Sequence, residues 1–185
     1  MWWFLILAVI VGFIRGGKFS VMPKFRFAWI LIPVALMQVL ALPQHSLAPL
    51  LVSVSYALTL IFLAVNWSYE EVRILLIGTA ANALVIWANG GSMPVLYGSA
   101  LTHFLPSSDL STASAWHNLL SSHSRFPLLA DIMYIPYPVP DMMSFGDIFI
   151  AAGGCLLIQR LMNKPVPLSH LANLGMSGAG RGSKK

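Results

Sequence analysis

Apolar residues along this chain form long runs that are separated by short polar or proline-containing connections. A helix that crosses the hydrocarbon core of a bilayer needs roughly 20 mainly apolar residues. Charge-poor runs approaching that length therefore predict membrane helices. We predict spans near residues 2–14, 27–42, 50–67, 72–88 and 146–162. The first is short, and its tryptophans, Trp2 and Trp3, are typical of an interfacial anchor.

Composition supports the same interpretation. Hydrophobic residues make up 57% of the chain and charged residues 9%, whereas soluble domains usually carry roughly 25% charged residues. We therefore expect the lipid bilayer to be the main solvent, and the predicted fold class is an all-α, polytopic integral membrane protein with about five transmembrane helices. The net charge of +5 does not predict a nucleic-acid partner, because the basic residues lie in the connections and not among exposed aromatic residues.

The distribution of Lys and Arg predicts an orientation. If the spans alternate in direction, ten basic residues fall on one side, and only Arg125 falls on the other. These ten are Arg15, Lys18, Lys24, Arg26, Arg73, Arg160, Lys164, Arg181, Lys184 and Lys185. The positive-inside rule places that side in the cytoplasm. The chain is therefore predicted to lie in the cell membrane as a multi-pass protein, with its N-terminus outside and its C-terminus in the cytoplasm.

The spans divide the chain into one transmembrane domain, residues 1–168, and a flexible basic cytoplasmic tail, residues 169–185. Residues 89–145 form a long outer loop that is too polar and too rich in Pro to span, yet keeps many apolar side chains. A loop of this length without structure of its own is unusual. We expect short interfacial helices in it, above all over residues 111–122.

Two stretches resemble a known family. Residues 89–95 read Asn-Gly-Gly-Ser-Met-Pro-Val. The second stretch begins with Leu-Ala-Asp-Ile at residues 129–132 and continues through a Pro-rich segment to Ser-Phe-Gly-Asp-Ile at residues 144–148. Both resemble DUF5317, a family of bacterial membrane proteins of unknown function. The resemblance covers most of the chain and implies several membrane helices, but it supplies no activity.

A second, local resemblance concerns two aspartates. Residues 145–153, which include Asp147, are similar to the final motif of signal peptidase II, in which one aspartate opens the last helix and another lies upstream. Asp131 would match the upstream aspartate. The asparagine-arginine context of that aspartate is absent here, and no pair of spans separates Asn89 from Asp131. This resemblance implies an extracytoplasmic hydrolase site built on Asp131 and Asp147.

Both aspartates are candidate catalytic residues, and each also has a structural interpretation. Asp147 at the start of an apolar helix can act in chemistry or can simply cap the helix. Asp131 has apolar neighbours, and burial would raise its pKa unless Arg125 or loop N–H groups compensate. Two carboxyl groups brought together could share a proton and activate a water molecule.

Four further residues are candidates for binding. Asn89 could donate to a ligand, although Gly90 and Gly91 directly after it also predict a helix end and turn. Asn82 lies deeper in the same span, so we expect its amide to bond to a neighbouring helix. The outer histidines, including His117, have no metal-ligand spacing and are interpreted as scattered interfacial residues. We predict no metal site and no cofactor.

Two functions remain open at this point. The first is an accessory or binding subunit, whose outer loop and helix faces dock a membrane protein partner or lipid. The second is a small membrane enzyme, possibly a hydrolase, that uses the aspartate pair. Whether the protein is an enzyme therefore stays undecided by the sequence. The first function is favoured, because each candidate residue also has an adequate structural role.

Overall fold

The computed structural model describes residues 3–20, 23–42, 46–96, 117–136 and 141–166. The helices are α1 (Trp3–Ile14), α2 (Leu31–Leu40), α3 (Ala48–Val65), α4 (Glu70–Ala88) and α6 (Phe145–Leu161), with short 3-10 turns η1 (Ala28–Ile30) and η2 (Pro127–Leu129). The strands are β1 (Met93–Val95), β2 (His117–Leu119), β3 (Met133–Ile135) and β4 (Asp141–Met143). The predicted tail, residues 169–185, lies outside the described residues.

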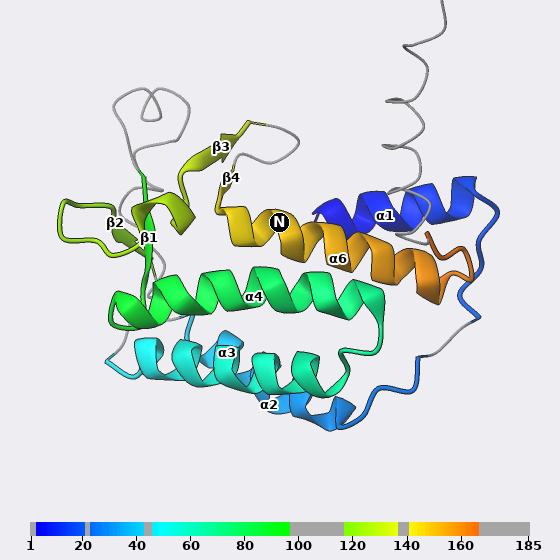
Figure 1. Cartoon of the computed structure of the whole chain (residues 1–185), viewed down its shortest axis with the longest axis horizontal. Coiled ribbons are helices and arrows are strands. Elements are labelled where there is room, and N and C mark those ends of the chain that lie inside the picture. The colour runs from blue at the N-terminus through cyan, green and yellow to red at the C-terminus, as the bar shows by residue number, and fades with distance from the viewer. Residues whose placement is uncertain (1–2, 21–22, 43–45, 97–116, 137–140, 167–185) are drawn as a thin grey trace, which may run out of the picture.

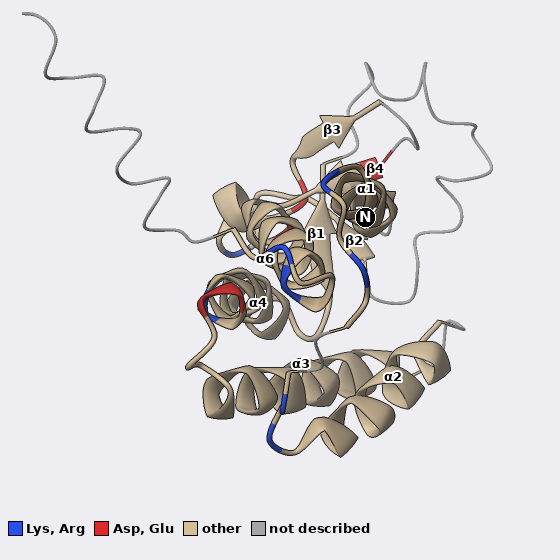
Figure 2. Ribbon diagram, turned by 90° about the vertical axis from the view of Figure 1, so that its right-hand side faces the viewer, with Lys and Arg blue, Asp and Glu red and all other residues tan. Residues whose placement is uncertain are grey.

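The helices pack side by side in the spatial order α1, α6, α4, α3, α2, which differs from their order in the chain (Figure 1). Figure 2, which looks along α4 and α6 and shows α2 and α3 from the side, also has α4 between α6 and the α2–α3 pair. The last helix thus lies between the first and the fourth. This order makes α4 the helix that links the two halves of the bundle.

The prediction of an all-α, five-span protein is wrong on two counts. Of the described helices, only α3 and α4 are long and apolar enough to cross a membrane. At about 1.5 Å per residue, the 12 residues of α1 and the 10 of α2 fall well short of a bilayer core. The described chain also contains two small β-sheets. What length and composition support is a mostly helical protein with two candidate membrane helices, which indicates membrane association.

The bounds of α3 and α4 have local causes. Pro49 lies in the first turn of α3, where its missing N–H has no cost and its fixed φ suits the helix. Glu70 and Glu71 lie in the first turn of α4, where negative charge favours the helix dipole. Each helix therefore begins two residues before the apolar run that predicted it.

The predicted outer loop contains the two sheets. β1 and β2 pair in parallel, and β3 and β4 form an antiparallel pair. Both sheets lie at the end of the bundle where α4 ends and α6 begins (Figure 1). The interfacial helix predicted over residues 111–122 is not found: residues 111–116 lie outside the described residues, and residues 117–119 form β2.

Small residues allow α4 and α6 to approach closely. A Cβ atom on Gly78 would lie 2.5 Å from the carbonyl oxygen of Gly146 and 2.8 Å from Cβ of Phe149. Further along, a Cβ atom on Gly153 would lie 2.8 Å from Cγ of Leu75. These pairs show that α6 runs antiparallel to α4. The backbones are close enough that neither Gly78 nor Gly153 leaves space for a methyl group.

Polar contacts join the helices at the end opposite the sheets. Glu71 is buried, and its Oε1 accepts a hydrogen bond of 2.9 Å from Nε of Arg160, which joins α4 to α6. A guanidinium nitrogen of Arg15 donates to Oε1 of Gln159 at 2.7 Å. The side chain of Asn66 both donates to the carbonyl oxygen and accepts from the N–H of Arg26. Basic residues therefore gather at this end.

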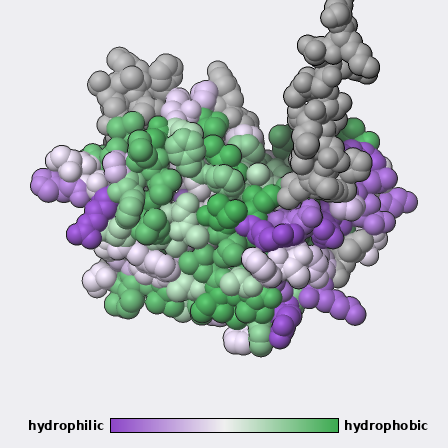
Figure 3. Space-filling view, in the orientation of Figure 1, coloured by the Kyte–Doolittle hydropathy of each residue, from purple (hydrophilic) through white to green (hydrophobic). Residues whose placement is uncertain are grey.

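Large apolar side chains cover much of the outer surface of the helices. Ile14, Ile32, Leu36, Val39 and Ile61 are all more than half exposed. Figure 3 shows apolar side chains across the middle of one face and hydrophilic ones toward its two ends. Monomeric soluble proteins rarely expose apolar patches of this extent, which mark contact with lipid or with another protein.

The α4–α6 contact generates a stability prediction. Gly78→Ala should lower the free energy of unfolding by about 1–3 kcal/mol, because the new methyl group meets backbone that cannot move aside. Gly154→Ala, on another face of α6, is the matched control. There the new Cβ meets only the flexible tip of Leu5 at 3.0 Å, so a gain of up to about 1 kcal/mol from helix propensity is expected.

Both variants are measured by denaturant unfolding in a mild detergent. Equal effects of the two substitutions would contradict close packing at Gly78.

Candidate functional site

Asp131 is held in place by β1. Its N–H donates to the carbonyl oxygen of Pro94 at 3.0 Å, and its carbonyl oxygen accepts from the N–H of Leu96 at 2.9 Å. It forms an isolated parallel bridge with Val95. On the other edge of β1, His117 is in register with Met93. Residues in register present their side chains to the same face, and alternate residues of a strand share a face, so Asp131 and His117 face the same side.

The two side chains meet on that face. Nε2 of His117 lies 3.5 Å from Oδ2 of Asp131. The Asp131 side chain is 7% exposed, and that of His117 is 33% exposed. Oδ1 of Asp131 is buried and has no hydrogen-bond partner among the described residues. A buried carboxylate oxygen in that state is costly.

Burial is the largest influence on Asp131 and raises the pKa of its carboxyl group above the ordinary value of 3.8. The hydrogen bond to His117 opposes this rise, and the negative charges of Asp147 and Asp141 add to it. The net shift of the pKa is upward. Desolvation and like charge disfavour the ionised form here more than His117 favours it.

Asp147 begins α6 as part of a capping box. Its N–H donates to Oγ of Ser144 at 3.0 Å, and its Oδ2 accepts from the N–H of Ser144 at 3.0 Å. Nδ2 of Asn82 donates to Oδ1 of Asp147 at 2.8 Å, and Oγ of Ser144 donates to Oδ1 of Asn82 at 2.8 Å. The bond from Asn82 to a neighbouring helix, expected from its depth in α4, is thus present. Both oxygens of Asp147 take part in this network.

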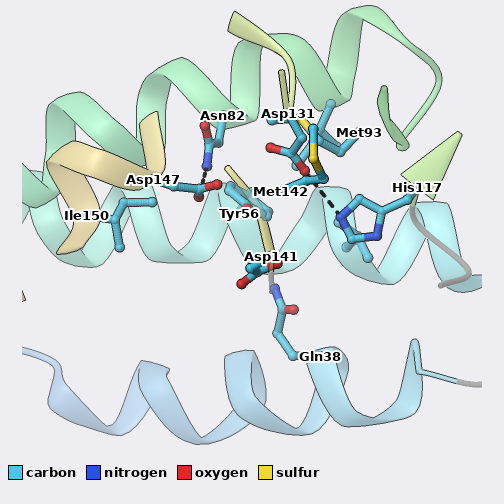
Figure 4. A pocket seen from close by; sticks show the side chains of 12 residues that line it. Gln38, Tyr56, Asn82, Met93, His117, Asp131, Asp141, Met142, Asp147 and Ile150 are labelled. Carbon is cyan, nitrogen blue, oxygen red and sulfur yellow. Dashed lines mark hydrogen bonds and ion pairs between the residues drawn. The ribbon is translucent and has the colours of Figure 1, made fainter. Parts of the chain in front are cut away.

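Asn82 and Asp147 of this network line one cavity of about 470 Å³ together with Asp131 (Figure 4). Its polar lining residues come from α2, α3, α4, α6, the strands and the bridged segment before β3: Gln38, Tyr56, Asn82, His117, Asp131, Asp141 and Asp147. Its apolar lining residues are Val52, Ile86, Met93, Met142 and Ile150. The structure therefore brings together three of the residues predicted from sequence, Asp131, Asp147 and Asn82.

The other predicted binding residues are not among those that line the cavity. Nδ2 of Asn89 donates to the carbonyl oxygens of Val85 and Arg125, and its Oδ1 accepts from the N–H of Arg125. Gly90 and Gly91 have positive φ angles of 70° and 88°. They end α4 in a left-handed turn, as glycines do at helix C-termini. In the structure these three residues shape the turn and attach the segment around Arg125.

His117, Tyr56, Asp141 and Gln38 line the cavity but were not predicted as site residues. His117 was interpreted as one of several scattered interfacial histidines, and only the pairing of β1 with β2 brings it to Asp131. Nε2 of Gln38 donates to Oγ of Ser55 at 2.7 Å, which links α2 to α3 at the cavity. The sequence signal for this link is that Gln38 and Ser55 are polar residues within two adjacent apolar runs, where each needs a hydrogen-bond partner.

Among the residues that the structure describes, no three His, Cys, Asp or Glu side chains converge closely enough to share a metal ion.

Comparison with protein families gives one match. Residues 22–159 match the family described as "Family of unknown function (DUF5317)", which confirms the resemblance carried by residues 89–95 and 144–148. Comparisons with curated proteins and with solved structures give no match. The matched region contains every residue that lines the cavity.

The environment of Asp131 predicts a pH dependence of stability. The folded protein holds this proton to a higher pH than the unfolded chain, so stability falls as the pH rises from 3.8 through the raised pKa. Asp131→Asn cannot ionise. Relative to the wild type, the variant should therefore gain stability as the pH rises from 4 to 8.

The measurement is the midpoint of thermal unfolding in detergent at each pH. A difference between the two proteins that does not change with pH would show that the substitution acts through packing and not through ionisation.

Proposed function

We propose that this chain, which belongs to the DUF5317 family of unknown function, is a membrane-associated binding protein whose cavity holds a ligand. The observation that carries the proposal is the cavity itself: seven polar side chains line about 470 Å³ within an otherwise apolar bundle. Polar and ionisable groups at membrane depth are costly and usually serve a function. Ligand pockets in proteins commonly measure roughly 300–1,000 Å³ and combine apolar walls with a few convergent polar groups.

Three features of the helices support a position of the bundle in a membrane. α3 and α4 have the length and composition of membrane helices, and the surrounding helices expose large apolar side chains. Arg15, Arg26, Arg73, Arg160 and Lys164 gather at the end opposite the sheets. The positive-inside rule assigns that end to the cytoplasm.

The cavity and the sheets then lie toward the outer face. The N-terminal end of α1 points in the same direction, because α1 runs parallel to α6: Phe4 contacts Cys155, and Ala8 contacts Gln159. Lys164, which follows α6 at the basic end, then faces the cytoplasm. The ligand is accordingly a lipid, or part of a membrane protein partner that this chain serves as an accessory subunit.

A second candidate is a small membrane enzyme, possibly a hydrolase. Asp131 and Asp147 line the same cavity, and their environments differ. Asp131 is buried, with one oxygen that has no hydrogen-bond partner among the described residues, and Asp147 caps a helix. Carboxyl groups in contrasting environments can divide the roles of acid and base. Binding is nevertheless the better supported function, because both oxygens of Asp147 already accept hydrogen bonds from Ser144 and Asn82.

The orientation is tested with single cysteines in a Cys155→Ser background. Ser122→Cys, beyond β2, should react with a membrane-impermeant thiol reagent on intact cells, because that segment faces outward. Ser20→Cys, an exposed position at the basic end, is the matched control and should react only after lysis. The opposite pattern would overturn the orientation.

Ligand binding is tested by native mass spectrometry of the full chain extracted from its own membrane in a mild detergent. The wild type should retain a non-covalent ligand. Met142→Trp should lose most of it, because the larger side chain fills the cavity from its β4 side. Leu128→Trp, at a position that is 74% exposed and not among the lining residues, is the control and should retain the ligand.

A wild-type chain with nothing bound, or a ligand retained equally by both tryptophan variants, would contradict a ligand site in this cavity.

A further inference from the structure

The charges that line the cavity have one sign. Asp131, Asp141 from β4 and Asp147 from α6 all contribute carboxyl groups, and no Lys or Arg is among the lining residues that the structure describes. His117 and Tyr56 are the other titratable groups of the lining. Figure 4 shows these side chains arranged around a common space between α2, α3, α4 and α6. A positively charged guest would be favoured electrostatically over a neutral or negative one.

Asp131 supplies an independent indication. Its side chain is 7% exposed and lines the cavity, and its Oδ1 has no hydrogen-bond partner among the described residues. The other oxygen, Oδ2, lies 3.5 Å from Nε2 of His117. Buried carboxylate oxygens in folded proteins are normally paired with a donor. The donor that Oδ1 lacks can therefore be supplied by a ligand.

We propose that the ligand carries an alkylammonium group and that this group donates a hydrogen bond to Oδ1 of Asp131. An ammonium group has donors and no acceptor, which matches a lining rich in acceptors. The apolar lining, including Val52, Ile86 and Met93, suits the carbon chain that bears the nitrogen. This inference rests on the proposed binding function and specifies the chemistry of its ligand.

An organic cation fits this lining better than a metal ion does. No three His, Cys, Asp or Glu side chains of the described residues converge as metal ligands. Both oxygens of Asp147 already accept hydrogen bonds, from Ser144 and Asn82. Asp147 therefore acts on a ligand through its negative charge and not as a hydrogen-bond acceptor. Asp131 therefore makes the directional contact, and the other two carboxyl groups supply the field.

The headgroup of a lipid is the source of the alkylammonium group that the proposed function favours. A soluble amine is the alternative source, and a separate arm of the experiment distinguishes it. The wild-type chain in nonionic detergent is titrated with phosphatidylethanolamine, its N-acetylated derivative and phosphatidylglycerol, all with the same acyl chains, and binding is followed by native mass spectrometry. Butylamine is titrated in parallel, and the thermal shift is recorded.

Phosphatidylethanolamine or butylamine should bind, and the N-acetylated lipid and phosphatidylglycerol should bind at least about 10-fold more weakly. Loss of a hydrogen bond to a charged group corresponds to about 10- to 100-fold in affinity. Asp131→Asn should weaken amine binding by that factor. Glu70→Gln, which removes the same charge near Arg73 at the other end of the bundle, should leave amine binding unchanged.

Equal binding of phosphatidylethanolamine and its N-acetylated derivative to the wild type would overturn the proposal without recourse to any variant. Unchanged amine binding by a folded Asp131→Asn chain would overturn it as well. If the wild type retains a ligand without a cationic nitrogen, and Met142→Trp displaces it, the binding function stands and the ammonium inference fails. If Met142→Trp changes the binding of neither the amines nor the native ligand, the binding function and the ammonium inference both fail.

Discussion

The close contact of α4 with α6 is the constraint on which the rest of the structure depends. Gly78 and Gly146 bring the two backbones together, and Asn82 joins the start of α6 through Ser144 and Asp147. A buried amide that lost these partners would leave unsatisfied polar atoms in an apolar bundle, which is costly. The network therefore fixes the position along α4 at which α6 begins. Because β4 directly precedes α6, the same position places β4 beside the cavity.

The cavity is built from both structural layers of the protein. The helices supply Asn82, Asp147 and much of the apolar wall, and the short strands supply His117 and Asp141. Asp131 comes from the segment between η2 and β3 and is bridged to β1 at Val95. Each strand has only three residues, and short isolated sheets are marginal in water. Their position against the end of the helix bundle gives them the support that their own hydrogen bonds do not.

Sequence reasoning located the helices and the family but not the site as a whole. The apolar runs at 50–67 and 72–88 lie within two residues of α3 and α4 at either end, because hydrophobic length is a strong local signal. The prediction that five helices cross the membrane was wrong, because the length of an apolar run does not fix the length of the helix that forms within it. Asp131, Asp147 and Asn82 were identified because carboxyl and amide groups in apolar surroundings are conspicuous.

The strands and the residues that they bring to the cavity could not be predicted in the same way. Three residues with no clear alternation, such as Met93–Val95, carry almost no periodic signal. His117 lies 14 residues before Asp131 in the chain and meets it only because both flank β1. Non-local pairing of this kind follows from the assembled fold and not from any local pattern.

The chain order of the bundle has a consequence for biosynthesis. Cavity residues run from Gln38 to Ile150, so the cavity is complete only after the last helix has emerged and inserted between α1 and α4. Until then the α3–α4 hairpin exposes Asn82 without its partners from Ser144 and Asp147. An incomplete chain of this kind leaves the Asn82 amide of α4 without the partners that it has in the folded protein, which is costly in apolar surroundings. Contacts so distant in sequence also form slowly, and the site is therefore expected to form late in folding, after the individual helices.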